Sequence, residues 1–195
     1  MIEAIAGIGT AFGLSGSAGL NAYIPLLVVA LAARFPLGDP LLKLAEPYDL
    51  LANWWVIGLL IVLLIIEMLV DKIPAVDTIN DGIQTIVRPV AGAILFAGST
   101  SVINDMNPVL AIIAGVLVAG GVHATKAIVR PAVTATTAGT GNWAVSIVED
   151  ISAFSISIMA LIVPVLAGVI VLIFVALIIW FLIRRRRRKK RKMML

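Results

Sequence analysis

Residues 53–70 read NWWVIGLLIVLLIIEMLV, a run in which Glu67 is the only ionisable side chain. A helix needs about 20 mostly apolar residues to cross the hydrocarbon core of a bilayer. The two tryptophans at the start of the run are of the type that gathers at membrane–water interfaces. This stretch therefore predicts a transmembrane helix that begins at the interface.

The composition of the whole chain supports the same interpretation. Of its 195 residues, 61% are hydrophobic and 13% are charged, and the mean hydropathy is +1.11. Soluble domains carry about 25% charged residues. Further apolar runs occupy residues 5–33, 89–103 and 151–183, and another begins at Pro108. We predict an all-α, polytopic transmembrane helical bundle of about five spans over residues 1–183, with glycine-broken or re-entrant helices.

The basic residues are unevenly distributed along the chain. Nine of the fifteen lie in residues 184–192, and the remainder of the chain has six basic against eleven acidic residues, a net charge of −5. Basic segments beside an apolar run stay in the cytoplasm and meet anionic lipid headgroups. We expect residues 184–195 to form a basic cytoplasmic tail of a multi-pass cell-membrane protein, with an external N-terminus and no nucleic-acid partner.

Glycine and proline set the expected helix boundaries. The first run should bend or break between Gly13 and Gly19, and residues 67–88 should form a loop or re-entrant segment. The third span should begin at Pro89 and the fourth at Pro108. The stretch from Pro131 to Asn142 is too polar to span, and the last run should be one helix kinked at Pro164.

Ionisable residues within the membrane domain are the main functional candidates, because their burial in lipid is costly. Two pairs of acidic residues have helical spacing, and a basic trio follows an i, i+3, i+7 pattern, so each set shares a helix face if its segment is helical. Paired carboxylates can bind a cation or pass a proton, and the basic trio can hold an anion or neutralise the carboxylates. The predicted site residues are Glu67, Asp71, Asp77, Asp81, Arg88, His123, Lys126, Arg130, Glu149 and Asp150.

Two repeated features extend this site. The tetrapeptide IVRP occurs at residues 86–89 and 128–131, which indicates an internal duplication of the kind found in transporters, or a chance match. Two glycine-rich segments end in Asn21 and Asn142, each followed by an aromatic residue within two positions. Backbone freed from helical geometry there could offer ligands to an ion, so both asparagines join the predicted site.

Each of these candidates also has a purely structural interpretation. Glycine and serine at this spacing serve close helix packing. Arg88 and Arg130 can be interfacial anchors whose side chains reach the headgroups. His123, the single histidine, excludes a multi-histidine metal site and can be a hydrogen-bonded structural residue. The carboxylates can form structural ion pairs with Lys72, Arg88, Lys126 or Arg130.

Four motifs in order give a resemblance to a known family. GSAGLNAYIP at residues 16–25, EMLVDKIPAVD at 67–77, Arg88-Pro89 and Glu149-Asp150 resemble an uncharacterised family of prokaryotic integral membrane proteins, the domain of unknown function 4126. The resemblance covers most of residues 5–165. It implies a small polytopic membrane protein and supplies no activity.

Three function classes follow from these observations. The leading hypothesis is a small transporter or channel for an ion or small charged solute, in which neutralising Asp71 or Asp77 abolishes flux. The second is a lipid-handling protein, either a flippase or a lipid-phosphate enzyme, and the third is a membrane scaffold. No catalytic motif is present, so we assign no catalytic residue or cofactor, leave a metal open, and do not favour an enzyme. Membrane lipids, the transported solute and a second copy of the chain are the expected partners.

Overall fold

The computed structural model describes residues 2–36, 44, 46–70, 74–99, 106–137 and 141–170, with single positions at 173, 176, 177, 180 and 184. These residues form six α-helices and a short 3-10 helix, and no strand is found among them. The elements are α1 (Ile2–Leu20), α2 (Tyr23–Arg34), η1 (Tyr48–Ala52), α3 (Trp54–Val70), α4 (Pro74–Ser99), α5 (Pro108–Thr137) and α6 (Gly141–Ile162). The all-α prediction is confirmed, and residues 185–195 of the predicted tail lie outside the described part.

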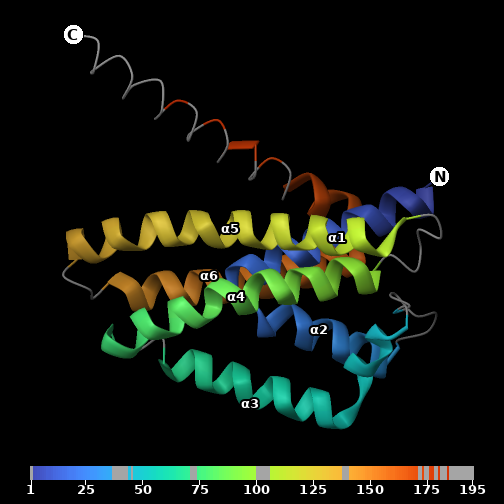
Figure 1. Ribbon diagram of the computed structural model, residues 1–195, viewed down its shortest axis with the longest axis horizontal. Coiled ribbons are helices and arrows are strands. Elements are labelled where there is room, and N and C mark those ends of the chain that lie inside the picture. The colour runs from blue at the N-terminus through green and yellow to red at the C-terminus, as the bar shows by residue number, and fades with distance from the viewer. Residues whose placement is uncertain are drawn as a thin grey trace.

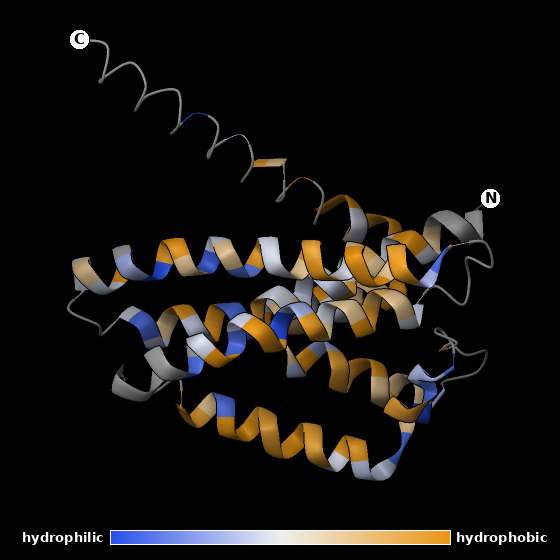
Figure 2. Ribbon diagram, viewed as in Figure 1, coloured by the Kyte–Doolittle hydropathy of each residue, from blue (hydrophilic) through white to orange (hydrophobic). Residues whose placement is uncertain are grey.

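Helix length and apolarity are compatible with a membrane bundle. Within the described residues, three helical stretches are long and apolar enough to cross a bilayer: residues 82–99 of α4, and the whole of α5 and α6. The helices α2 and α3 are apolar but shorter. Figure 2 shows hydrophobic residues along almost all of α3, whereas the hydrophilic residues of α5 gather in the half nearer Thr137. The three basic site residues predicted on α5, His123, Lys126 and Arg130, lie in this half.

The helix α1 forms the centre of the bundle, with α4, α5 and α6 packed around it (Figure 1). Its small polar residues donate hydrogen bonds to backbone carbonyls of its neighbours: Thr10 to Ala160, Ser15 to Gly92 and Ser17 to Ala153, at 3.0, 2.8 and 2.7 Å. These bonds satisfy the buried hydroxyls and bring the helix backbones close together. The glycine- and serine-rich segment thus serves helix packing in this structure.

The predicted break in the first apolar run is displaced. The helix α1 continues without interruption through Gly13 and Gly19 and ends at Leu20, and Asn21 and Ala22 separate it from α2, which begins at Tyr23. The prediction of a break inside the glycine-rich segment was therefore wrong, because the helix ends only after that segment. Glycine in a helix tolerates close neighbours without breaking the helix, because its backbone hydrogen bonds remain intact.

Small residues also permit the close approach of α4 and α5, which run side by side (Figure 1). A Cβ atom added to Gly92 would lie 2.8 Å from the Gly115 carbonyl oxygen, and one added to Gly115 would lie 2.7 Å from the Ala93 Cα. Both distances are shorter than ordinary van der Waals contacts. Glycine at these positions lets the two backbones touch.

One of the two helix starts predicted at a proline was wrong. The helix α4 starts at Pro74 and contains Pro89 within it, so residues 74–88 are helical and do not form a loop. The helix α5 starts at Pro108, as predicted, but it also contains Pro131 and continues to Thr137. Proline removes one backbone donor without ending a helix when the surrounding helices hold the chain in place.

The last apolar run is interrupted near the predicted position. The helix α6 begins at Gly141, ten residues before the predicted start, and ends at Ile162, where Val163 forms a bend. Residues 164–170 form a further helical segment that packs on α1, because Gly168 lies against Gly9. The prediction of a single kinked helix across residues 151–183 was therefore wrong. Of residues 171–183, only four are described.

Candidate functional site

Ionisable and polar side chains from α1, α3, α4, α5 and α6 meet inside the bundle near the junction of α1 and α2. We call this group the polar cluster. Its members are linked by hydrogen bonds or ion pairs, and most are buried: Asn21, Glu67, Thr85, Arg88, His123, Lys126, Arg130, Ser146, Glu149 and Asp150. The sequence had predicted eight of these ten residues.

Arg88 organises one half of the polar cluster. Its Nη2 atom donates to Oε1 of Glu67 at 3.2 Å, and its Nη1 atom lies 3.2 Å from Nδ1 of His123. Arginine has no acceptor, so Nδ1 of His123 must accept this hydrogen bond. The ring proton is then on Nε2, which donates to the Thr85 hydroxyl at 3.1 Å. His123 is therefore held as a neutral imidazole between a cation and a hydroxyl.

Glu149 organises the other half. Its Oε2 atom lies 2.7 Å from the Lys126 Nζ and 3.3 Å from the Arg130 Nη2. Arg130 also donates to the Ser146 hydroxyl at 2.7 Å. One turn of α6 separates Ser146 from Glu149, so a single face of α6 receives the basic face of α5. The predicted i, i+3, i+7 face of α5 is confirmed, because His123, Lys126 and Arg130 are all buried.

Asn21 connects the polar cluster to the junction between α1 and α2. Its side-chain Nδ2 atom donates to Asp150 Oδ1 at 2.9 Å, and its Oδ1 atom accepts from the backbone N–H groups of Tyr23 and Ile24. The bonds from Tyr23 and Ile24 satisfy backbone N–H groups that have no carbonyl partner within the first turn of a helix. One side chain thus closes the start of α2 and holds a carboxylate of α6.

The polar cluster contains equal numbers of cationic and anionic side chains. Three cations, Arg88, Lys126 and Arg130, are directly paired with two carboxylates, Glu67 and Glu149, while the third carboxylate, Asp150, is bound by Asn21. Within the described part of the chain, the buried Nε of Arg88 and Oε1 of the adjacent Gln84 have no hydrogen-bond partner. The cluster therefore combines balanced formal charges with a buried donor and a buried acceptor that have no hydrogen-bond partner.

Four predicted site residues are not placed in the polar cluster. Asp71 lies outside the described residues, and for Asp77 and Asp81 only the backbone, in the first turns of α4, is described. Asn142 is elsewhere, near the start of α6, where its Oδ1 accepts from the Thr134 hydroxyl at 3.0 Å. Asn142 lies about two helical turns before Glu149, which explains why it is separated from the polar cluster.

Sequence reasoning missed Thr85 and Ser146. Each precedes an ionisable cluster residue by three positions, Thr85 before Arg88 and Ser146 before Glu149. Polar residues at that spacing share the helix face of the charged residue. A search for uncharged hydrogen-bonding residues on the same face would have found both.

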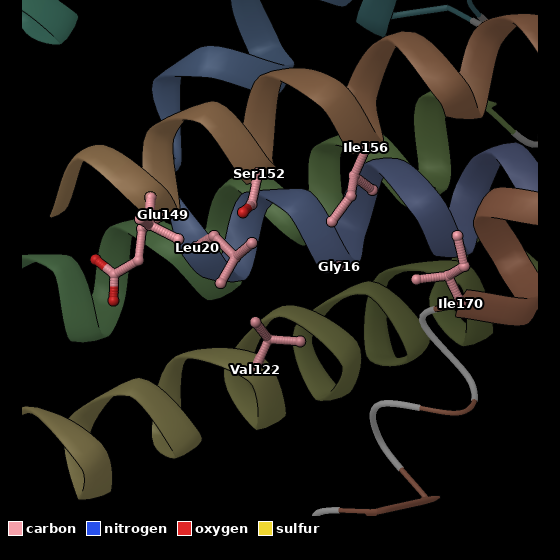
Figure 3. Close-up of a pocket in the computed structure, with 8 residues that line it drawn as sticks. Gly16, Leu20, Val122, Glu149, Ser152, Ile156 and Ile170 are labelled. Atoms are coloured by element: carbon pink, nitrogen blue, oxygen red, sulfur yellow. The ribbon is translucent and has the colours of Figure 1, made fainter. Parts of the chain in front are cut away.

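A groove lies beside the polar cluster. It has a volume of about 290 Å³ and is bounded by α1, α5, α6 and the segment 164–170 (Figure 3). Glu149 stands at one end, Ser152 lies along the same wall, and Ile170 lies at the opposite end. The other lining residues are Gly16, Leu20, Val122, Val148 and Ile156. A charged end is thus continuous with an apolar channel between helices.

The described residues limit the chemistry of the site. Nowhere in the described ranges do three histidine, aspartate or glutamate side chains converge in a way that could hold a metal ion. The carboxylates are instead held by cationic side chains and amides. The arrangement can stabilise, exchange or bind charge within the bundle.

Comparison with known proteins gives one match. A family described as Domain of unknown function (DUF4126) matches residues 8–184. Neither the curated proteins nor the solved structures contain a match to this chain. The matched range includes every residue of the polar cluster and all residues that line the groove.

Proposed function

Because the chain belongs to the DUF4126 family, whose description assigns no activity, we propose a function from its polar cluster: the protein moves an ion or small charged solute across a membrane. The observation that supports this is a set of buried charges that share partners between four helices. An apolar bundle requires no such set for packing, because apolar residues of similar volume often give equal or greater stability than a buried ion pair.

Shared partners give the polar cluster a way to exchange ions. One oxygen of Glu149 serves both Lys126 and Arg130, and the guanidinium of Arg88 serves both Glu67 and His123. An incoming charged solute can take one of the two partners while the other still holds the side chain. The charged groups then stay compensated throughout the exchange, which keeps its energetic cost low.

The polar cluster holds three cations and three carboxylates, so it has groups that can compensate a solute of either charge. We further propose that Asp71, Asp77 and Asp81 handle a cation or proton that is coupled to this movement. They lie just before α4 or in its first turns, close in sequence to Arg88.

The proposal includes a location and an assembly. The protein is a multi-pass protein of the cell membrane with its basic tail in the cytoplasm and an external N-terminus. A bundle of this size makes a thin wall around a pathway, so we propose a homo-oligomer. The repeated IVRP tetrapeptide supports an ancient duplication, since both copies place a buried arginine in the polar cluster.

Flux through liposomes tests this function directly. Purified protein in liposomes should give an electrogenic current or dye signal with at least one of chloride, nitrate, phosphate, potassium, sodium or protons, and the Glu149→Gln variant should reduce it at least tenfold. Asp49→Asn, which removes an exposed carboxylate of η1, is the matched control and should leave flux unchanged. Silence of the wild-type protein across the whole panel would overturn the proposal.

The groove beside Glu149 favours lipid handling as a second candidate function. It joins an apolar channel to a charged end, which suits a molecule with a chain and a head group. If the ion panel is silent, a fluorescent-lipid scrambling assay on the same liposomes separates a flippase from a scaffold, because only the flippase accelerates lipid exchange between leaflets.

A further inference from the structure

We infer that the groove between α1, α5, α6 and residues 164–170 is a binding site for a single-chain amphiphile with an uncharged, hydroxylated head group, such as a monoacylglycerol. This binding site shares Glu149 with the ion pathway proposed above, but its ligand is a lipid rather than an ion. It depends on two polar atoms on α6 and on the apolar walls opposite them.

The two polar atoms are Oε1 of Glu149 and Oγ of Ser152. Glu149 uses only its Oε2 atom for Lys126 and Arg130, and no hydrogen bond to another described residue engages its Oε1 or the Ser152 hydroxyl. The two residues are three positions apart on α6, so they share a face. Figure 3 shows both side chains along the groove.

The charge around Glu149 selects the head group. Lys126 and Arg130 both lie within 3.3 Å of the same Glu149 oxygen, and Asp150 follows Glu149 in sequence, so two cations and two carboxylates balance at this end of the groove. An ammonium head would approach Lys126 and Arg130, and a carboxylate head would approach the Glu149 carboxylate. An uncharged hydroxyl donates to Oε1 and exchanges a hydrogen bond with Ser152 without either repulsion.

The apolar walls and the volume of the groove favour a ligand with a single alkyl chain. Beyond Ser152 the groove is lined by Gly16, Leu20, Val122, Ile156 and Ile170, none of which carries a polar side-chain atom. Its volume of about 290 Å³ lies near the lower limit of small-molecule sites, which are about 300–1,000 Å³. One alkyl chain fits such a space, whereas a two-chain phospholipid exceeds it.

A photoaffinity experiment tests the inference. Full-length protein in phosphatidylcholine nanodiscs is exposed to a diazirine-bearing monoacylglycerol, and the labelled peptides are identified by mass spectrometry. We expect labelling of α1 and α6 that excess unlabelled monoacylglycerol removes. Ile156→Trp, which fills the channel, should lower labelling at least tenfold, and Ser152→Ala should lower it about fivefold through the loss of one hydrogen bond.

Matched variants and probes keep the result specific. Ile147→Trp and Ser155→Ala alter exposed positions of the same helix and should label like the wild type. Equal labelling of Ile156→Trp, Ser152→Ala and these controls would overturn the site. Stronger labelling of the same peptides by a fatty acid or a long-chain amine of equal length would overturn the assigned head group. Ion flux has no part in this readout, so failure of the transport proposal leaves it intact.

Discussion

The guanidinium of Arg88 and the carboxylate of Glu67 lie 3.2 Å apart inside the bundle, and their side chains are 1% and 2% exposed. Glu67 is one of only three buried residues described in α3, together with Ile57 and Leu60. Most of the other residues of α3 are exposed. The ion pair therefore fixes the C-terminal half of α3 to α4, and the same arginine continues to His123 on α5.

Removing either partner of this pair should destabilise the protein strongly. Glu67→Leu or Arg88→Met alone leaves one buried charge without its partner, at a cost of about 3–5 kcal/mol. The double variant leaves no such charge and should recover most of that loss. Thermal unfolding in detergent micelles measures all three variants, and simple addition of the two single effects in the double variant would contradict the pairing.

The Glu149 triad should respond unequally to the loss of its members. Glu149→Gln leaves Lys126 and Arg130 facing each other without a shared carboxylate, so both stability and flux should fall. Lys126→Met removes one of the two cations that share Glu149 and leaves the contact between Arg130 and Glu149 intact, so stability should change less than in Glu149→Gln. Unfolding and liposome flux measured on both variants check the order, and a greater loss of stability in Lys126→Met would show that Lys126 alone holds Glu149.

The helical class and most of the polar cluster could be predicted from the sequence, because apolar runs and intramembrane charges are strong local signals. The family resemblance is also confirmed by the match over residues 8–184. The continuation of α4 through Pro89 and of α5 through Pro131 could not be predicted in the same way. Proline restricts only local geometry, and whether a helix continues through it depends on the neighbours that hold it.

Partner choice within the polar cluster was also beyond the sequence. Glu149 and Asp150 are adjacent, yet one joins two cations of α5 and the other joins Asn21 at the end of α1. Successive helix positions point in directions about 100° apart, so neighbours in sequence face different helices. Only the packing of α6 against both α1 and α5 decides which residue meets which partner.

Asn21 should contribute more than a helix cap. Asn21→Ala removes its bond to Asp150 and its two bonds to the start of α2, so we expect a loss of about 2–3 kcal/mol from several interactions of about 1 kcal/mol each. Asn53 accepts a similar backbone bond at the start of α3 from an exposed position, and Asn53→Ala is the matched control, expected to cost about 0.5–2 kcal/mol. Equal losses in thermal unfolding would show that the contact with Asp150 contributes nothing.

The contact between α4 and α5 should be sensitive to added volume. Gly115→Ala and Gly92→Ala each place a methyl group within 3 Å of the opposite helix, so the helices must separate at a cost of about 1–3 kcal/mol. Gly58 on α3 has no atom within 4 Å of an added Cβ, so Gly58→Ala should be neutral or stabilise the helix by up to about 1 kcal/mol.

The separation of α4 from α5 should also disturb the contacts within the polar cluster. Arg88 lies one turn before Gly92 on α4, and its bond to His123 crosses the interface that Gly115 keeps narrow. Gly115→Ala should therefore weaken flux as well as stability, although it alters no charged residue. Liposome flux at a temperature where Gly115→Ala remains folded separates the two effects. Flux equal to that of Gly58→Ala under those conditions would mean that the polar cluster tolerates a wider spacing of α4 and α5.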